Sequence, residues 1–375
     1  MTFSNMSVEE ILRSLEDGIR DFMQTDRYKD YLKAVGRFHD YSTNNIALIT
    51  MQKPDATLVA GYSTWKNAFN RSVKKGEKGI RIIAPCPVQV EKEKDVIDAC
   101  GNLHREKQKV TIPRFRCVSV FDVSQTEGDR IPDIDPAKLT AEVEDYGSFI
   151  RALEMTSRVP VCYTEIEDGS RGYYDARTGK IAVKSGMGQS QTVKTLIHEI
   201  AHSYLHSRED GGALMPSATK EVEAESVAYT VCSAFGIDTS EYTFPYVTAW
   251  ASKTENEALK ESMDRIRETA SDIIHTVTDR FREVKREAEI EDIASETAGI
   301  MVESGYTLQS FGEAKDRIKE LISDGRTLSL TLNLREAAEN AEDPLNKADI
   351  ASLIDRINGI NEDKNEPENR REMER

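Results

Sequence analysis

Residues 192–207, TVKTLIHEIAHSYLHS, contain the pattern His198-Glu199-Ile200-Ala201-His202. Two histidines four residues apart lie on the same face of an α-helix, one turn from each other. Their imidazole nitrogens can reach one tetrahedral zinc ion, and Glu199 can act as the general base toward water at the metal. The stretch therefore predicts the metal-binding helix of a zinc hydrolase.

The neighbouring residues indicate that this helix is packed rather than exposed. Apolar side chains recur through it at helical spacing: Leu196, Ile197, Ile200, Ala201 and Tyr204. We expect Ser190 or Thr192 to be the N-cap. His206 continues the same face for one more turn, and we expect it at the helix end, beyond the reach of the metal.

A catalytic zinc needs a third protein ligand and an open position for water. A second helix over residues 218–237 carries Glu221 and Glu225 on one face, and Glu221 follows His202 by 19 residues. We assign Glu221 as the third ligand and Glu225 as the acceptor for the other ring N–H of a ligating histidine. The two roles can be exchanged, and the alternative is that both carboxylates face solvent.

Residues 170–186 predict a hairpin before the metal helix, with a turn at 175–179 and a strand at 180–183. Such a strand would form the rim of a cleft, where an extended peptide can pair with it. Tyr173 and Tyr174 lie near this rim. One is a candidate for stabilising an oxyanion, and core packing is the alternative for at least one of them.

The preceding part of the chain has the pattern of an α+β domain. We expect helices at 7–25 and 27–39, a third that starts with Ser42 or Thr43 as its cap and ends before Pro54, and a fourth at 63–70. β-Branched and aromatic segments predict strands at 57–60, 79–84, 88–91 and 115–121.

The segment at residues 66–81 of this domain is basic, although the whole chain has a formal net charge of −16. Single-strand binders combine cationic side chains with aromatic faces on which bases stack. The candidate DNA-binding residues are Trp65, Lys66, Arg71, Lys74, Lys75, Lys78 and Arg81. The alternatives are that Trp65 anchors the core of its helix and that the lysines only solubilise a turn.

Composition limits the class of protein. With 375 residues, 38% hydrophobic and 31% charged, the chain is long enough for two or three globular domains. It has no apolar run long enough for a membrane span, and its N-terminus lacks the features of a signal peptide. Five scattered cysteines favour reduced thiols, so we expect a cytoplasmic protein.

Both parts of the chain resemble one family. The pattern GYYD…GKIAV…TLIHEIAHSYLH…EVEAESVAY between roughly residues 140 and 250 resembles a zincin metallopeptidase domain of the gluzincin type. It is similar to that of ArdC-type antirestriction proteins and, more loosely, to ImmA/IrrE-type regulatory peptidases. Residues 44–88 and 115–128 are similar to the ArdC N-terminal domain. This resemblance implies single-stranded DNA binding and the antirestriction function of a mobile element.

The C-terminal third has a different character, to which the resemblance does not extend. Apolar residues from Leu259 to Val284 recur at spacings of three and four, which predicts a long amphipathic helix. Further helices are expected at 290–304, 310–323, 334–341 and 347–357. We therefore expect four regions: a DNA-binding domain at 1–130, a zincin-like domain at 131–252, a helical region at 253–360 and a disordered tail at 361–375.

The leading hypothesis is a Zn²⁺-dependent metallopeptidase fused to a single-stranded-DNA-binding domain, with a protein or peptide as substrate. His198, His202 and Glu221 would hold the metal, and Glu199 would be catalytic. Two histidines and a carboxylate also accept Mn²⁺ or Co²⁺. The alternatives are a non-proteolytic DNA-binding antirestriction module with a structural zinc fold, and a regulatory protease that cleaves a repressor.

Overall fold

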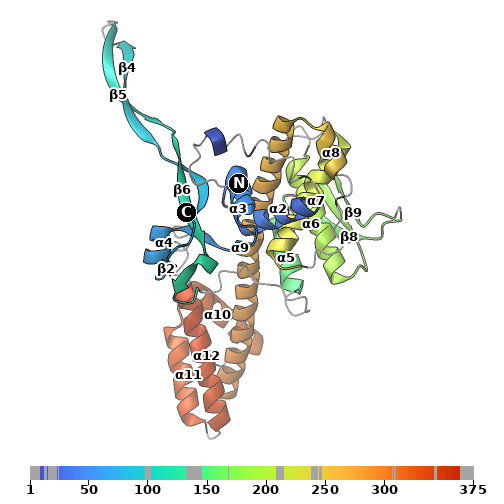
Figure 1. Cartoon of the computed structure of the whole chain (residues 1–375). Coiled ribbons are helices and arrows are strands. Elements are labelled where there is room, and N and C mark those ends of the chain that lie inside the picture. Colours follow the sequence, from blue (N-terminus) through green and yellow to red (C-terminus); the bar gives the residue numbers. More distant parts are fainter. Residues whose placement is uncertain are drawn as a thin grey trace. The chain divides into compact units, whose positions relative to one another are not determined.

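The computed structural model describes residues 9–11, 15, 23, 25–97, 103–131, 146–167, 169–207, 215–237, 244, 247–305, 307, 310–341 and 344–363. Most of the helix expected at 7–25, and residues 364–375 of the tail expected at 361–375, lie outside these residues, whereas residues 361–363 are helical and not part of a disordered tail. The chain divides into two compact units, Met1–Tyr146 with Leu153–Thr276, and Gly147–Ala152 with Val277–Arg375. The fold is α+β, as expected (Figure 1).

A three-stranded antiparallel sheet organises the N-terminal part of the first unit. Its order is β1-β6-β3, formed by β1 (Val59–Gly61), β6 (Phe115–Asp122) and β3 (Ile80–Pro85). Alternate residues Ile80 and Ile82 are buried, which is the period-two pattern of a strand with one face on the core. The strands expected at 57–60, 79–84 and 115–121 are thus confirmed to within two residues.

Helix α3 (Thr43–Gln52) covers the open edge of β3. Its N-cap is Ser42. The Asn45 amide donates to the Ile83 carbonyl and accepts from the Ile83 N–H, both at 2.9 Å. Gln52 makes the same pair with Arg81 at 2.9 Å. Asn45 and Gln52 are two helical turns apart, so their amides take the place of a further strand and satisfy an edge that would otherwise be exposed.

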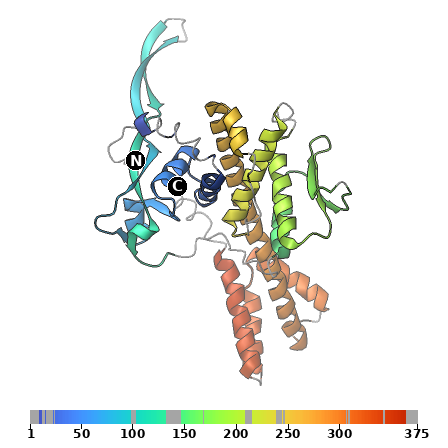
Figure 2. The same cartoon turned by 45° about the vertical axis from the view of Figure 1, so that its right-hand side comes forward.

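One strand of the structure is longer than the sequence predicts, and its partner strand was not predicted at all. β4 (Val88–Ile97) extends well past the expected end at residue 91, and it pairs antiparallel with the unexpected β5 (Leu103–Ile112). Together they form an arm that extends from β3 and β6 (Figures 1 and 2). The run of alternating Glu and Lys at 91–94 lacks the apolar alternation that marks a strand in sequence. Periodicity therefore missed this hairpin.

Helix α4 (Tyr62–Asn67) and the two-stranded ladder of β2 (Arg71–Val73) and β7 (Thr126–Gly128) complete this part of the unit. The helix is shorter than the expected 63–70: it ends at Asn67 with Ala68 as its C-cap, and Asn70 then adopts a positive φ of 49° just before β2. This left-handed conformation turns the chain into the ladder.

Helix α2 (Thr25–Arg37) packs against α7 (Ser217–Ala234). The buried Tyr28 hydroxyl and Ser226 Oγ lie 2.7 Å apart and share a hydrogen bond, and the Tyr28 ring meets Phe244 edge-on. A buried hydroxyl needs such a partner, because leaving it unpaired costs about 1–3 kcal/mol. The contact joins residues 198 positions apart.

A second three-stranded sheet, of order β8-β10-β9, lies along helix α6 (Gln189–Leu205), as both views show (Figures 1 and 2). β10 (Lys180–Lys184) pairs parallel with β8 (Val161–Thr164) and antiparallel with β9 (Gly172–Asp175). Its central residues 181–183 are all buried. The expected hairpin is confirmed, but Gly188, rather than Ser190 or Thr192, is the N-cap of α6. Thr192 lies inside the helix, where its hydroxyl donates to the Gly188 carbonyl.

Helices complete both units. α8 (Val247–Lys253) belongs to the first, and α9 (Asn256–Glu303) begins in the first and ends in the second. The separate helix expected at 290–304 is wrong, because no glycine, proline or cap interrupts the chain between Val284 and Ile290. α5 (Tyr146–Thr156) contributes residues to both units.

The second unit has a core made by the end of α9 with three further helices, α10 (Phe311–Asp324), α11 (Leu328–Asn340) and α12 (Pro344–Asp363). Ser310 caps α10 in a capping box with Glu313, as the Ser-x-x-Glu spacing allows. Among the described residues, no helix is both long and apolar enough to cross a membrane. The proposed four-region division of the chain stays a prediction.

Candidate metal centre

Three metal-binding side chains converge where α6 packs against α7. The Nε2 atoms of His198 and His202 lie 3.1 Å apart, and the Glu221 carboxylate oxygens lie 3.7 Å from each of them. Metal bonds of about 2.0–2.1 Å in a tetrahedral arrangement separate ligand atoms by about 3.3–3.4 Å. The three donors therefore fit one small transition-metal ion.

Glu225 occupies a different position around the same site. One of its carboxylate oxygens lies 3.3 Å from Nδ1 of His198, on the ring side opposite Nε2. An acceptor there holds the proton on Nδ1 and leaves the Nε2 lone pair for a metal. In this geometry Glu221 faces both Nε2 atoms, whereas Glu225 faces the far side of one ring.

Electrostatics act on the two histidines in opposite directions. Burial alone would lower the pKa of His198, but the neighbouring carboxylates Glu225, Glu199 and Glu221 outweigh it and raise that pKa. Burial lowers the pKa of His202. Since a metal ligand must be neutral, a bound cation and protons compete for these rings.

His206 belongs to a buried network behind His202, which the sequence analysis missed. The Nδ1 atoms of His202 and His206 lie 3.0 Å apart, and Nε2 of His206 lies 3.3 Å from the Glu223 carboxylate. Glu223 is fully buried and also accepts hydrogen bonds from Ser262 and Arg265.

The position of Glu223 has a signal in the sequence. Glu223 precedes the buried Val227 by one helical turn, so it lies on the apolar face of α7. A carboxylate on such a face is buried only when it is paired. The orientation of His202 thus depends on His206, and that of His206 on a carboxylate held by α9.

Glu199 lies beside the metal ligands and against strand β9. Its side chain is buried, and burial raises the pKa of its carboxyl to about 7. The backbone N–H of Tyr174 hydrogen-bonds it. Gly172 allows this approach: a Cβ there would come within 2.7 Å of the Thr195 methyl and 3.2 Å of Glu199 Cγ. A buried carboxylate beside the metal ligands is in the position that a general base requires.

Strand β9 forms the rim of the site. It is an edge strand of its sheet, and edge strands carry backbone groups that can pair with another chain. The Tyr173 side chain is 48% exposed, whereas Tyr174 is half-buried. Tyr173 therefore remains available to a ligand at the rim.

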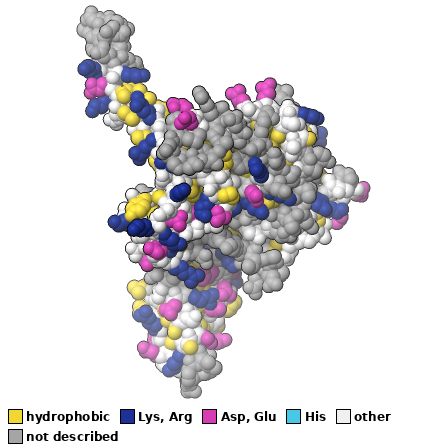
Figure 3. Space-filling view, in the orientation of Figure 1, with side chains coloured by type: hydrophobic (Ala, Val, Ile, Leu, Met, Phe, Trp, Pro, Cys, Tyr) yellow, Lys and Arg dark blue, Asp and Glu magenta, His cyan; other side chains and the backbone are white. Residues whose placement is uncertain are grey.

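The basic candidates lie on the N-terminal part of the first unit, where Figure 3 shows Lys and Arg side chains beside hydrophobic ones over α4 and β2. Four lysines are exposed: Lys66, Lys74, Lys75 and Lys78. Tyr62, which is 57% exposed, supplies an aromatic face in the same region.

Besides Lys74, whose ammonium donates to the Ser124 carbonyl at 2.9 Å, three other candidates are held by the fold. Arg71 hydrogen-bonds Thr126 and the Gly128 carbonyl, and Arg81 is half-buried with Nη1 donating to Ser119 at 3.3 Å. Trp65 is fully buried, and its indole N–H donates to the Phe121 carbonyl at 2.8 Å. A base cannot stack on a ring without exposed surface, so Trp65 is a core anchor.

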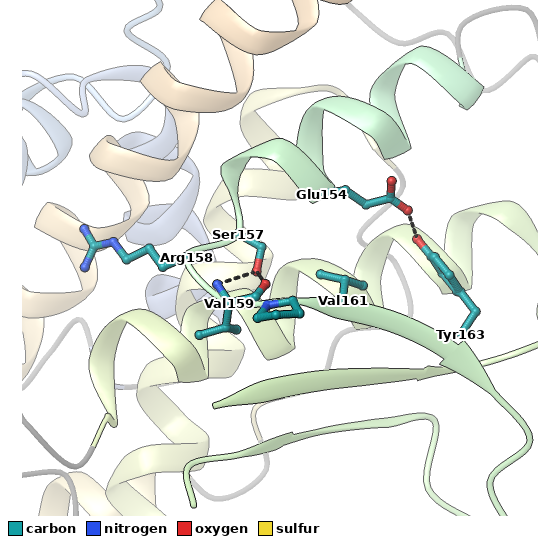
Figure 4. Close-up of a pocket in the computed structure, with 7 residues that line it drawn as sticks. Glu154, Ser157, Arg158, Val159, Val161 and Tyr163 are labelled. Carbon is teal, nitrogen blue, oxygen red and sulfur yellow. Dashed lines mark hydrogen bonds between the residues drawn. The ribbon is translucent and has the colours of Figure 1, made fainter. Parts of the chain in front are cut away.

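A shallow depression of about 620 Å³ lies between the end of α5 and β8 (Figure 4). Tyr163 donates a hydrogen bond to Glu154 at 2.7 Å at one side of it, and Ser157 and Arg158 line the other. None of its lining residues belongs to the metal cluster. It carries no chemistry that connects it with the metal centre.

Comparison with known proteins bears on the N-terminal domain. Residues 3–121 match the family model of the N-terminal domain of anti-restriction factor ArdC. An uncharacterized protein of Bacillus anthracis is 28% identical in an alignment of 363 residues, and this alignment covers 85% of the present chain. The chain spans 60% of the length of that relative.

Two crystal structures of the antirestriction protein ArdC from plasmid R388 are similar to this chain. The metal-free form is 20% identical with a TM-score of 0.40, and the Mn(II)-bound form is 18% identical with a TM-score of 0.38. Each alignment covers 65% of this chain, and 85% and 84% of the respective ArdC chain. The family-model match alone confirms the resemblance expected from the sequence, for residues 3–121, which match the N-terminal domain of ArdC.

Proposed function

We propose that this protein is a metal-dependent peptidase joined to a single-stranded-DNA-binding domain, and that it acts against restriction. The observation that carries the proposal is the convergence of His198, His202 and Glu221 beside the buried Glu199. Two imidazoles and one carboxylate around an open position are typical of catalytic zinc rather than of structural zinc. The antirestriction role rests on the ArdC match of residues 3–121.

His198, His202 and Glu221 would hold the metal, which when bound supplies a Lewis acid that polarises the scissile carbonyl and acidifies water. Glu199 accepts the proton of the attacking water and delivers it to the leaving amine. The backbone N–H of Tyr174 orients the carboxylate for this transfer. An extended peptide can pair with the edge strand β9, which brings its backbone beside Glu199.

Glu199→Gln tests the chemical step. The variant keeps the size of the side chain and all three metal ligands, so it should retain stoichiometric zinc. We expect hydrolysis of an unfolded protein substrate to fall by at least about 100-fold, the range of general acid–base catalysis. Glu225→Gln is the matched control: it should weaken zinc binding about 10–100-fold, with activity restored by excess metal. Wild-type turnover by Glu199→Gln would refute the mechanism.

Protection of DNA against restriction in cells separates the proposal from its alternative. If Glu199→Gln loses protection, proteolysis is part of the function. If it retains protection, the protein acts as a non-proteolytic DNA-binding module in which the metal stabilises the fold. A repressor-cleaving protease would show neither protection nor single-strand binding.

The DNA-binding part of the proposal rests on the exposed lysines of the turn after β2. Replacing Lys74, Lys75 and Lys78 together by alanine removes about three phosphate contacts. The slope of log affinity for single-stranded DNA against log salt concentration should then become less steep by about 2. The matched control replaces three exposed lysines elsewhere in the first unit, Lys33, Lys180 and Lys253. Equal effects of the two triple variants would refute a specific DNA surface.

A further inference from the structure

A second group of metal-binding side chains lies in the first unit, apart from the proposed active site. His39 follows the end of α2, Asp40 is next to it, and His275 comes from α9, 236 residues later. The His39 and His275 rings meet edge-on with centroids 4.9 Å apart. The chain has six histidines, and five of them belong to this group or to the His198–His206 series.

The donor atoms have separations suited to one ion. A carboxylate oxygen of Asp40 lies 3.1 Å from His275 Nε2, and the other lies 3.8 Å from His39 Nε2. All three residues offer donors within 4.8 Å of one another. Ligand atoms around tetrahedral zinc are about 3.3–3.4 Å apart, so small side-chain rotations would complete a coordination sphere.

The hydrogen bond on the far side of His39 prepares this ring for a metal. Its Nδ1 lies 2.9 Å from the Gly36 carbonyl, which can only accept, so the ring proton is on Nδ1. In the neutral ring Nε2 then directs a lone pair toward the Asp40 carboxylate. Two electron-rich atoms face each other favourably only with a cation between them or with a proton on Nε2. A backbone carbonyl on the second ring nitrogen is also the usual support of a metal-ligating histidine.

We propose that His39, Asp40 and His275 form a second site for a divalent transition-metal ion, with Zn²⁺ as the first candidate. Imidazole ligands favour zinc, cobalt, nickel or copper over magnesium and calcium. The His39 side chain is 17% exposed, Asp40 44% and His275 51%. The site is therefore open to water, which would fill the remaining positions, and its ion would clamp the end of α2 to α9.

The test is the zinc stoichiometry of the whole chain after equilibrium dialysis against Zn²⁺ buffered at micromolar concentration. We expect two ions per wild-type chain, one in His275→Ala, one in His198→Ala/His202→Ala, and none in the triple variant. Asp40→Asn removes the charge of the third ligand at a half-exposed position, and it should also lower the zinc content below two ions per chain. His104→Ala removes the one histidine outside both groups, on β5, and should keep two ions.

A thermal readout complements the stoichiometry. Zinc should raise the melting temperature of His198→Ala/His202→Ala, because an ion that binds only the folded state stabilises it, and this rise should vanish in the triple variant. A single ion in the wild type that is lost with His198→Ala/His202→Ala would overturn the proposal. Two ions retained in both His275→Ala and Asp40→Asn would overturn it as well.

Discussion

The ion pair between Glu223 and Arg265 should contribute strongly to the stability of the first unit. The Glu223 side chain has no exposed surface, and it accepts hydrogen bonds from Arg265 Nη2 and Ser262 Oγ, each at 2.5 Å. Burial alone would raise the pKa of this carboxyl, but hydrogen bonds from His206, Arg265 and Ser262 outweigh it and lower the pKa. Arg265→Met keeps the length of the side chain and removes its charge.

Loss of one partner of a buried ion pair costs about 3–5 kcal/mol, because the other charge stays buried. The Arg265 side chain is 35% exposed, so solvent already screens part of the pair, and we expect the lower end, about 3 kcal/mol. Adding Glu223→Gln to Arg265→Met removes the uncompensated charge. The double variant should therefore recover about 1–2 kcal/mol of that loss.

Urea unfolding of the metal-free protein, followed by tryptophan fluorescence, measures this difference. Both tryptophans, Trp65 and Trp250, belong to the first unit, so the signal reports on that unit. Chelation of metal removes the stabilisation by bound ions from the comparison. Arg177→Met is the control, because Arg177 is 77% exposed and its loss should change stability by less than about 0.5 kcal/mol.

Two results would contradict a strong interaction between Glu223 and Arg265. A change below about 0.5 kcal/mol for Arg265→Met would mean that solvent compensates Glu223 fully. Strict additivity of Arg265→Met and Glu223→Gln would mean that the two side chains do not interact.

Three further predictions concern other parts of the first unit. Gly172→Ala should lower hydrolysis more than zinc affinity, because its Cβ would collide with Thr195 on the strand side of Glu199; equal losses in turnover assays and zinc titrations would contradict this. Asp122→Asn should cost about 1–3 kcal/mol at pH 7. Burial alone would raise the pKa of Asp122, but hydrogen bonds from Ser124, Thr57 and Leu58 hold it below its usual value. The stabilisation by Asp122 is therefore present above about pH 4 and lost as the pH falls through its lowered pKa. In an acid titration followed by circular dichroism, the stability of the Asn variant should depend less steeply on pH than that of the wild type. Trp65→Phe should destabilise by about 1–3 kcal/mol through the lost indole hydrogen bond and a cavity, and it should leave single-strand affinity unchanged in fluorescence anisotropy when the fold is intact.

The sequence by itself determined the features that depend on neighbours along one helix. His198 and His202 are one turn apart, as are Glu221 and Glu225, and these separations follow from helix geometry whatever surrounds it. For the N-cap of α3 the sequence left Ser42 and Thr43 as candidates, and the structure has Ser42. The strands of the β1-β6-β3 sheet were predictable because one face is apolar.

Only the tertiary structure decided which carboxylate meets which histidine and which distant residues join. That Glu221 faces both Nε2 atoms while Glu225 lies behind one ring depends on how α7 rotates against α6. The meeting of His39 with His275 depends on how α9 lies against the end of α2. The physical reason is common to these cases: local spacing sets the direction of a side chain within its own element, whereas a site between elements exists only once burial of their apolar faces has set their packing.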